Sequence, residues 1–132
     1  MRQTGFMEVK RSLERSAKRS ALAIRAETLV SEYLAKRGYE IVQRNARLGH
    51  LEIDIIARRG SLLVFCEVRS RSSDIWMTPA QTIDRGKAER IRRAAIQYLA
   101  LANPRPKEVR IDVASVVYDV EGGRIDYFES AL

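Results

Sequence analysis

Two short apolar runs separated by only two residues constrain the fold of this chain more than any other feature. The runs are 51–57 (LEIDIIA) and 62–69 (LLVFCEVR), and both are rich in β-branched and aromatic residues, as strands are. Gly60-Ser61 between them suits a type II′ turn, which favours Gly at its first central position. The sequence therefore predicts an antiparallel hairpin in which Arg59 pairs with Leu62.

The register of this hairpin brings charged residues of the two runs together. Counting back from the turn places Asp54 opposite Glu67 and Glu52 opposite Arg69. Opposed residues share one face of a sheet, with Cβ atoms roughly 5 Å apart. Two carboxylates at that separation repel unless a cation lies between them, and hard oxygen ligands suit Mg²⁺ or Mn²⁺. Asp54 and Glu67 are therefore candidate metal ligands; the alternative is that both face solvent on a half-exposed sheet.

Three further charged residues are candidates for the same site. Glu27 lies at the margin of a helical apolar stripe, where it either reaches over the sheet edge towards a metal or is an ordinary solvated glutamate. Lys87 precedes the apolar stripe of a second helix by one turn, so its ammonium either snorkels to the surface or points towards the carboxylates. Arg69 either serves the site or forms a cross-strand ion pair with Glu52.

The remaining sequence predicts one α/β domain. Helical spacing of apolar residues predicts a helix over about 17–37 that ends at Gly38, followed by a strand over about 39–47. After the hairpin, Thr78-Pro79 begins a short helix with a capping box, and a longer helix ends before 103–106. A strand over 109–118, a turn at 121–123 and a strand over 125–128 complete a mixed sheet. Residues 1–16 are predicted to form a basic flexible arm and 17–132 the domain.

The charge of the chain favours a polyanionic partner. The 132 residues carry a net charge of +7, which is typical of proteins that bind nucleic acid, although a solvated basic surface is the alternative. Arginines near the hairpin, together with one asparagine, are candidate contacts to phosphates, which fix position without reading sequence. They are Arg44, Asn45, Arg47, Arg58, Arg59 and Arg71.

Several function classes are excluded by composition. A single histidine excludes a histidine-based metal site or triad, and no Gly-rich phosphate loop or GxSxG motif is present. A single cysteine, Cys66, excludes an internal disulfide, fits a reducing compartment and is expected in the core. No run reaches the roughly 18–20 apolar residues of a membrane span, and the basic N-terminus lacks the apolar stretch of a signal peptide. We therefore expect a cytoplasmic protein with no membrane partner.

The order and spacing of several motifs resemble those of the YraN-like family of small bacterial proteins. That family has a predicted restriction-endonuclease-like fold within the PD-(D/E)XK superfamily, which includes archaeal Holliday-junction resolvases and uses Mg²⁺ to hydrolyse phosphodiesters. The resemblance implies a three-layer α/β sandwich with a mixed central sheet flanked by helices, in the order α-β-β-β-α-β-β. It runs from about residue 20 to the C-terminus and rests on Ala26-Glu27, Asn45-Ala46-Arg47, Glu52-Ile53-Asp54-Ile55-Ile56, Val64-Phe65-Cys66-Glu67-Val68-Arg69-Ser70-Arg71, Lys87 and Arg110-Ile111-Asp112-Val113.

The same resemblance implies roles for individual residues. Glu27, Asp54 and Glu67 match the metal-binding acids, and Val68 would add its main-chain carbonyl. The family pattern ends its second catalytic strand in Glu-Val-Lys, whereas this chain has Arg69 in the lysine position. Arginine keeps the charge and can clamp a phosphate, but it cannot act as a base because its pKa stays above roughly 12. Lys87 is a candidate source of the missing amine.

Three functions are consistent with these features. The leading hypothesis is a Mg²⁺- or Mn²⁺-dependent nuclease acting on DNA, including branched or otherwise structured DNA. The second is a DNA-binding module of the same fold that does not cut, which the arginine at position 69 favours. The third is a scaffold whose basic arm contacts an acidic protein. Analogy with resolvases also suggests a homodimer, for which Ile75, Trp76 and Met77 offer an apolar loop that belongs either to the interface or to the core.

Overall fold

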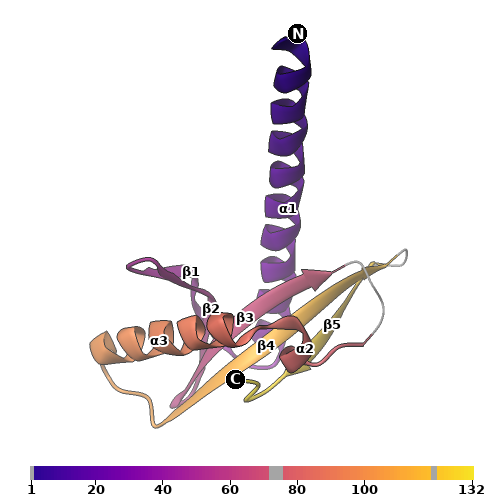
Figure 1. Ribbon diagram of the computed structural model, residues 1–132. Helices are drawn as coiled ribbons and strands as arrows, with labels where there is room; N and C mark the ends of the chain where they lie inside the picture. The colour runs from indigo at the N-terminus through magenta and orange to yellow at the C-terminus, as the bar shows by residue number, and fades with distance from the viewer. Residues whose placement is uncertain (1, 72–75, 120–121) are drawn as a thin grey trace.

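Three layers make up the structure, a computed structural model that describes residues 2–71, 76–119 and 122–132. A five-stranded sheet in the order β1-β2-β3-β4-β5 forms the middle layer, with α1 on one face and α2 and α3 on the other (Figure 1). Only the β3–β4 pair is parallel among the described strands, so the sheet is mixed. The predicted fold class and element order are confirmed, and α2 is the short helix predicted to begin at Thr78-Pro79. The elements are α1 (Arg2–Lys36), β1 (Glu40–Leu48), β2 (Leu51–Arg59), β3 (Leu62–Arg71), α2 (Pro79–Thr82), α3 (Arg85–Leu101), β4 (Glu108–Asp119) and β5 (Gly122–Phe128).

The β2–β3 hairpin has the predicted register near its turn and departs from it further on. Gly60 adopts a φ of 61° at the turn, and the strands pair from Arg59–Leu62 to Ile55–Cys66. The ladder ends there, while β3 continues beside β4 as far as Arg71–Val117. The predicted pairing of Glu52 with Arg69 is therefore wrong, because β2 leaves β3 before either residue is reached. The sheet forks at this point.

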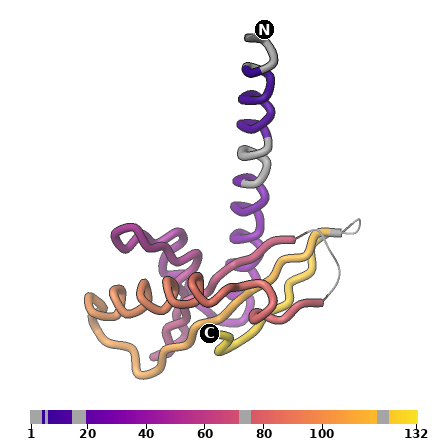
Figure 2. The backbone as a smooth tube through the Cα atoms, viewed as in Figure 1, coloured from indigo at the N-terminus to yellow at the C-terminus, as the bar shows by residue number. Residues whose placement is uncertain are grey.

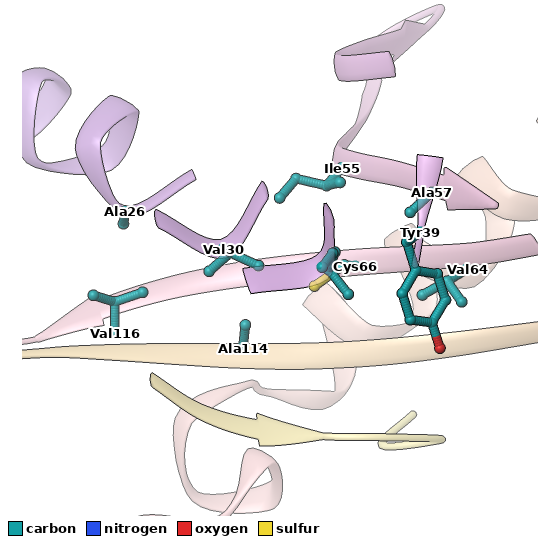
Figure 3. Packing of buried hydrophobic residues seen from close by; sticks show 10 residues of the cluster. Ala26, Val30, Tyr39, Ile55, Ala57, Val64, Cys66, Ala114 and Val116 are labelled. Carbon is teal, nitrogen blue, oxygen red and sulfur yellow. The ribbon is translucent and has the colours of Figure 1, made fainter. Parts of the chain in front are cut away.

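Two apolar cores hold the layers together. On one face, Ala26 and Val30 of α1 pack against Cys66 of β3 and Ala114 of β4 (Figure 3). On the other face, Ala94 and Ala95 of α3 pack against β2 and β3. Cys66 is completely buried in the first core, as predicted.

The helix α1 is longer than the sequence pattern predicted. It begins at Arg2, so the segment expected to be an irregular arm is helical and continuous with the part that packs on the sheet (Figures 1 and 2). The docked part supplies the nucleus, after which each added residue costs little, and 2–16 contains no proline. The described side chains before Ala26 are exposed, so this extension adds nothing to the core.

Side-chain hydrogen bonds mark the starts of α2 and α3. The Thr78 N–H donates to Oε1 of Gln81 at 2.7 Å, which is half of the predicted capping box. Asp84 then caps α3 by accepting from the N–H of Lys87 at 2.8 Å. Trp76 is 58% exposed, with its ring 5.8 Å from that of Phe128. Ile75 of the predicted apolar loop and Glu121 of the predicted turn lie outside the described residues, and the homodimer remains a prediction.

Candidate active site

A reversal in β1 and β2 creates the fork. The register of these strands places Asn45 opposite Asp54, and Asn45 adopts a left-handed conformation with a φ of 51°. Residues two apart in a regular strand share a face. Here Ile53 packs beneath α3 whereas Ile55 packs beneath α1, so β2 changes its facing at Asp54. Asparagine is among the few residues that adopt this conformation readily, and the β2–β3 ladder ends one residue from Asp54, at Ile55–Cys66.

Asp54 bridges the two branches of the fork. Its Oδ2 accepts a hydrogen bond from the main-chain N–H of Val68 at 2.8 Å. Because β2 has left the ladder, that N–H has no carbonyl opposite it on β2, and the carboxylate takes the place of the missing acceptor. The carboxylate of Asp54 is thus fixed beside the β3 backbone, next to the residue before Val68, which is Glu67.

Glu67 and Lys87 complete the centre of the site. Glu67 is only 4% exposed, and its Oε1 lies 3.3 Å from the Nζ of Lys87. Burial, and then the neighbouring Asp54 carboxylate, raise the pKa of Glu67 to about 8, although the Lys87 ammonium opposes the shift. Of the two interpretations of Lys87, the structure supports the one in which its ammonium points towards the carboxylates. The predicted closeness of Asp54 and Glu67 is therefore present, although it arises at a fork and not in a ladder.

Glu27 approaches the same centre from α1. Its side chain is buried, and its Oε2 accepts from Nδ2 of Asn45 at 3.0 Å and lies 3.7 Å from Arg44. Burial raises the pKa of Glu27, Asn45 opposes that shift, and the negative charge of Asp54 adds to it. The interpretation of Glu27 as a solvated helix glutamate is wrong. Asn45 was predicted only as a phosphate contact, yet its amide links this third acid to the strand reversal.

The basic residues predicted at the site make different contacts. The Arg69 guanidinium donates to the carbonyl of Thr82 at 3.1 Å, which ties β3 to the end of α2. Arg44 donates to Oγ1 of Thr28 at 3.1 Å in addition to its contact with Glu27. Arg71 is largely buried, 3.9 Å from Asp126. Asn45, Arg47, Arg58 and Arg59 are exposed, whereas Arg44 and Arg71 are partly buried, so four of the six predicted phosphate contacts have open side chains.

The raised pKa of Glu67 predicts how stability depends on pH. Its usual value is 4.5 and its value in the folded protein is about 8, so folding favours the protonated form. This contribution is fully present below pH 4.5 and is lost as the pH rises through 8, by roughly 2–5 kcal/mol without metal. Urea unfolding at pH 5.5 and pH 9, with a chelator present, measures it. Glu67→Gln should flatten this dependence, whereas Glu89→Gln, at an exposed position of α3, should not; equal slopes for the wild type and Glu67→Gln contradict the prediction.

Comparisons with known proteins place the chain in a family. The sequence profile of Uncharacterised protein family UPF0102 matches residues 26–116. The chain belongs to UPF0102. Relatives include a UPF0102 protein of Dictyoglomus thermophilum, 36% identical over 101 residues that cover 76% of this chain and 86% of the relative. Another, from Anaeromyxobacter sp. (strain Fw109-5), is 34% identical over 114 residues and 86% of both chains; one from Sorangium cellulosum is 42% identical over 103 residues, covering 76% of this chain and 72% of its own.

One solved structure shows a weak similarity. The structure of Pyrococcus furiosus SfsA in complex with Ca²⁺ aligns with a TM-score of 0.36 and 16% sequence identity. The alignment covers 83% of this UPF0102 chain and 63% of that chain. Within the described residues of the UPF0102 chain, no helix is long and apolar enough to cross a membrane.

All of the site lies inside the family match. Residues 26–116 contain Glu27, Asn45, Asp54, Glu67 and Lys87, so the fork and its charged groups belong to the UPF0102 domain. The projecting part of α1 lies before the match begins.

The donor groups of the UPF0102 site fit a divalent cation that keeps several water ligands. Among the described residues, no three His, Cys, Asp or Glu side chains are grouped to hold a metal ion. Asp54 and Glu67 nevertheless place two carboxylates together, each next to the backbone of Val68. Mg²⁺ is usually held by one or two carboxylates together with water and substrate phosphate, and not by a full protein cage. Burial first, and then the Asp54 carboxylate, raise the pKa of Glu67, and a cation bound between the two carboxylates would oppose both effects.

Proposed function

We propose that this UPF0102 protein is a Mg²⁺- or Mn²⁺-dependent nuclease that hydrolyses DNA phosphodiesters. The observation that carries the proposal is the forced approach of Asp54 and Glu67 at the fork, with Lys87 3.3 Å from Glu67. A protein that only needed a stable sheet would gain by pairing these strands fully or by placing apolar residues there. Clustered carboxylates with raised pKa values beside an ammonium are typical of functional sites.

Each side chain has a role in this proposal. Asp54 and Glu67 would hold the ion, with Glu27 supporting a water ligand through its own carboxylate, and the Val68 carbonyl would contribute from the backbone. A bound divalent cation would acidify water and offset charge on the phosphate. Lys87 lies next to Glu67 and is available to the phosphate being attacked. Arg69 adds electrostatic attraction only, because a guanidinium does not take up a proton from water.

The alternative function is a DNA-binding module that does not cut. The observation in its favour is the contact of Arg69 with the Thr82 carbonyl, which occupies the arginine in holding α2. On this alternative, the acids and Lys87 stabilise the fork as a charge network, and the basic residues alone contact DNA. The two functions differ in one measurable property, which is metal-dependent cleavage.

Cleavage assays on a panel of DNA structures test the proposal. We expect the purified protein to cut at least one of labelled linear duplex, single-stranded, flapped and four-way-junction DNA with Mg²⁺ or Mn²⁺, and to stop when a chelator is added. The panel includes branched forms because the resemblance to resolvases makes them the first substrates to compare. Binding to every member of the panel with no cutting in either metal would favour the binding module.

A further inference from the structure

The net positive charge of this chain is densest in the part of α1 that precedes the UPF0102 match. Residues 2–25 contain seven Lys or Arg and two Asp or Glu, a net charge of +5 over 24 residues. The family match, 26–116, contains sixteen Lys or Arg and eleven Asp or Glu, the same net charge of +5 spread over 91 residues. The charge argument for a polyanionic partner is therefore strongest, residue for residue, for the first part of α1.

This part of α1 projects from the sheet as a free helix (Figure 1). The contacts that tie its inner end to the domain include the hydroxyl of Tyr118, which donates to the Leu22 carbonyl at 3.3 Å, Arg44, which donates to the Ile24 carbonyl at 3.3 Å, and the Arg25 guanidinium 5.8 Å from the Tyr118 ring centroid. Described side chains such as Lys10 and Arg11 are exposed. At 1.5 Å per residue, 2–25 is about 36 Å long, close to one helical turn of duplex DNA.

One side of α1 runs from the projecting part into the core of the domain. Steps of three or four residues connect positions 11, 15, 18 and 22 with 26, 29 and 33, and these steps follow one side of a helix. The inner positions of this series include Ala26, which is buried against the sheet, and Arg11, whose side chain is exposed, lies at the outer end. The side of the helix that bears Arg11 thus continues the domain-facing side past the sheet edge. Glu27 of the candidate site lies where the helix enters the domain.

We propose that residues 2–25 of α1 form a DNA-binding element that contacts the phosphate backbone and holds a duplex beside the acids of the fork. This inference rests on the proposed function in taking the polyanion to be DNA. Duplex DNA carries one phosphate charge per about 1.7 Å of its axis, both strands counted, so a basic helix of this length meets phosphates along its whole extent. Exposed apolar residues such as Val9 and Leu13 do not favour a second copy of the helix, since pairing would bring two segments of net +5 together.

The salt dependence of DNA binding tests the inference in the full chain. The arm variant is Lys10→Gln, Arg11→Gln, Lys18→Gln and Arg19→Gln; glutamine preserves helix propensity. The matched control removes the same number of positive charges from exposed positions of α3 and the segment after it, and is Arg92→Gln, Arg93→Gln, Arg105→Gln and Lys107→Gln. Binding to a labelled 30-base-pair duplex is followed by fluorescence anisotropy from 50 to 300 mM salt, with a chelator present. Circular dichroism checks that both variants keep the helix content of the wild type.

We expect the slope of log Kd against log salt concentration to be smaller by about 3 in the arm variant than in the wild type. Binding by this variant should be at least about tenfold weaker at 100 mM salt. The control should change the slope by less than about 1. Equal slopes for the two variants overturn the inference. The inference is also overturned if the arm variant has the same slope as the wild type but a smaller sedimentation coefficient. That result would identify the helix as a self-association element.

The outcome for the arm is separable from the outcome for the nuclease. Cleavage by both variants at low salt, with equal salt slopes, would leave the nuclease standing and remove the DNA-binding role of the helix. A slope that depends on the arm, in a protein that never cuts, would leave the helix as a DNA-binding element and remove the nuclease.

Discussion

Asp54→Asn is expected to abolish metal-dependent cleavage of DNA, with a loss of about 10³-fold or more in rate. A loss of this size corresponds to several kcal/mol of transition-state stabilisation, which is the contribution expected of a ligand to a catalytic cation. Asparagine keeps an oxygen that can accept from the Val68 N–H, so the fork is retained while the negative charge is lost. Single-turnover cleavage of the best DNA substrate from the panel, at saturating metal, measures the effect.

Two further variants make this result specific. Glu52→Gln removes a carboxylate from an exposed position two residues away on the same strand, and should keep the rate within about threefold because Glu52 acts on the site only through a charge effect on Glu27, the smallest of those that shift its pKa. Lys87→Ala leaves the main-chain cap to Asp84 intact and should lower the rate by about 10- to 100-fold, since it removes only the ammonium beside Glu67. Equal activity of Asp54→Asn and the wild type would exclude Asp54 as a ligand. An unchanged rate in Lys87→Ala beside an inactive Asp54→Asn would exclude the role of Lys87.

The features of the site that depend on local sequence can be predicted from the sequence alone. Gly60-Ser61 sets the turn, and the turn sets the pairing of the first five residue pairs, because register propagates from a two-residue loop. The same counting brings Asp54 and Glu67 near each other. The apolar and charged pattern also placed Lys87 at the end of the core-facing stripe of α3, which is where its ammonium reaches Glu67.

The fork itself cannot be predicted from the local pattern of apolar and polar residues. It depends on the left-handed conformation of Asn45 on one side and on the parallel pairing of β3 with β4 on the other, which joins segments more than 40 residues apart. A signal was nevertheless present: apolar residues alternate at Leu51 and Ile53 and then run without interruption through 55–57. A break in alternation next to an asparagine on the neighbouring strand indicates a reversal of facing.

Contacts made by segments distant in sequence account for the remaining differences. The carbonyl that Arg69 meets belongs to Thr82, whose position depends on how α2 docks. Pairing of Arg69 with Glu52 followed from extending the hairpin register, and such an extension fails wherever a strand changes partners. The helical state of residues 2–16 follows from continuity with a docked helix, which a search for apolar periodicity in 2–16 alone does not reveal.

Asp112→Ala is expected to be the most destabilising single substitution outside the apolar cores, lowering the free energy of unfolding by about 3–5 kcal/mol. Asp112 is completely buried on β4. Its carboxylate accepts from Nε of Arg110 at 2.9 Å, from the Ser130 N–H at 2.9 Å and from the hydroxyl of Tyr127. Alanine would leave a largely buried guanidinium, a hydroxyl and a main-chain N–H without this acceptor, and it would remove one of the hydrogen bonds that hold the C-terminal segment on the sheet. Against a total stability of typically 5–15 kcal/mol, this loss is a large fraction.

The same arginine supplies the control. Glu129 also lies near Arg110, at 3.5 Å, but its side chain is 63% exposed. Glu129→Gln should therefore cost no more than about 1 kcal/mol, because an exposed ion pair is screened by water and salt. Urea unfolding of both variants at pH 7 provides the comparison, and a second measurement in 1 M salt should diminish only the Glu129 effect. Equal losses for the two variants would mean that Asp112 contributes through charge attraction alone, and that the hydrogen bonds from Tyr127 and Ser130 do not hold the C-terminal segment in place.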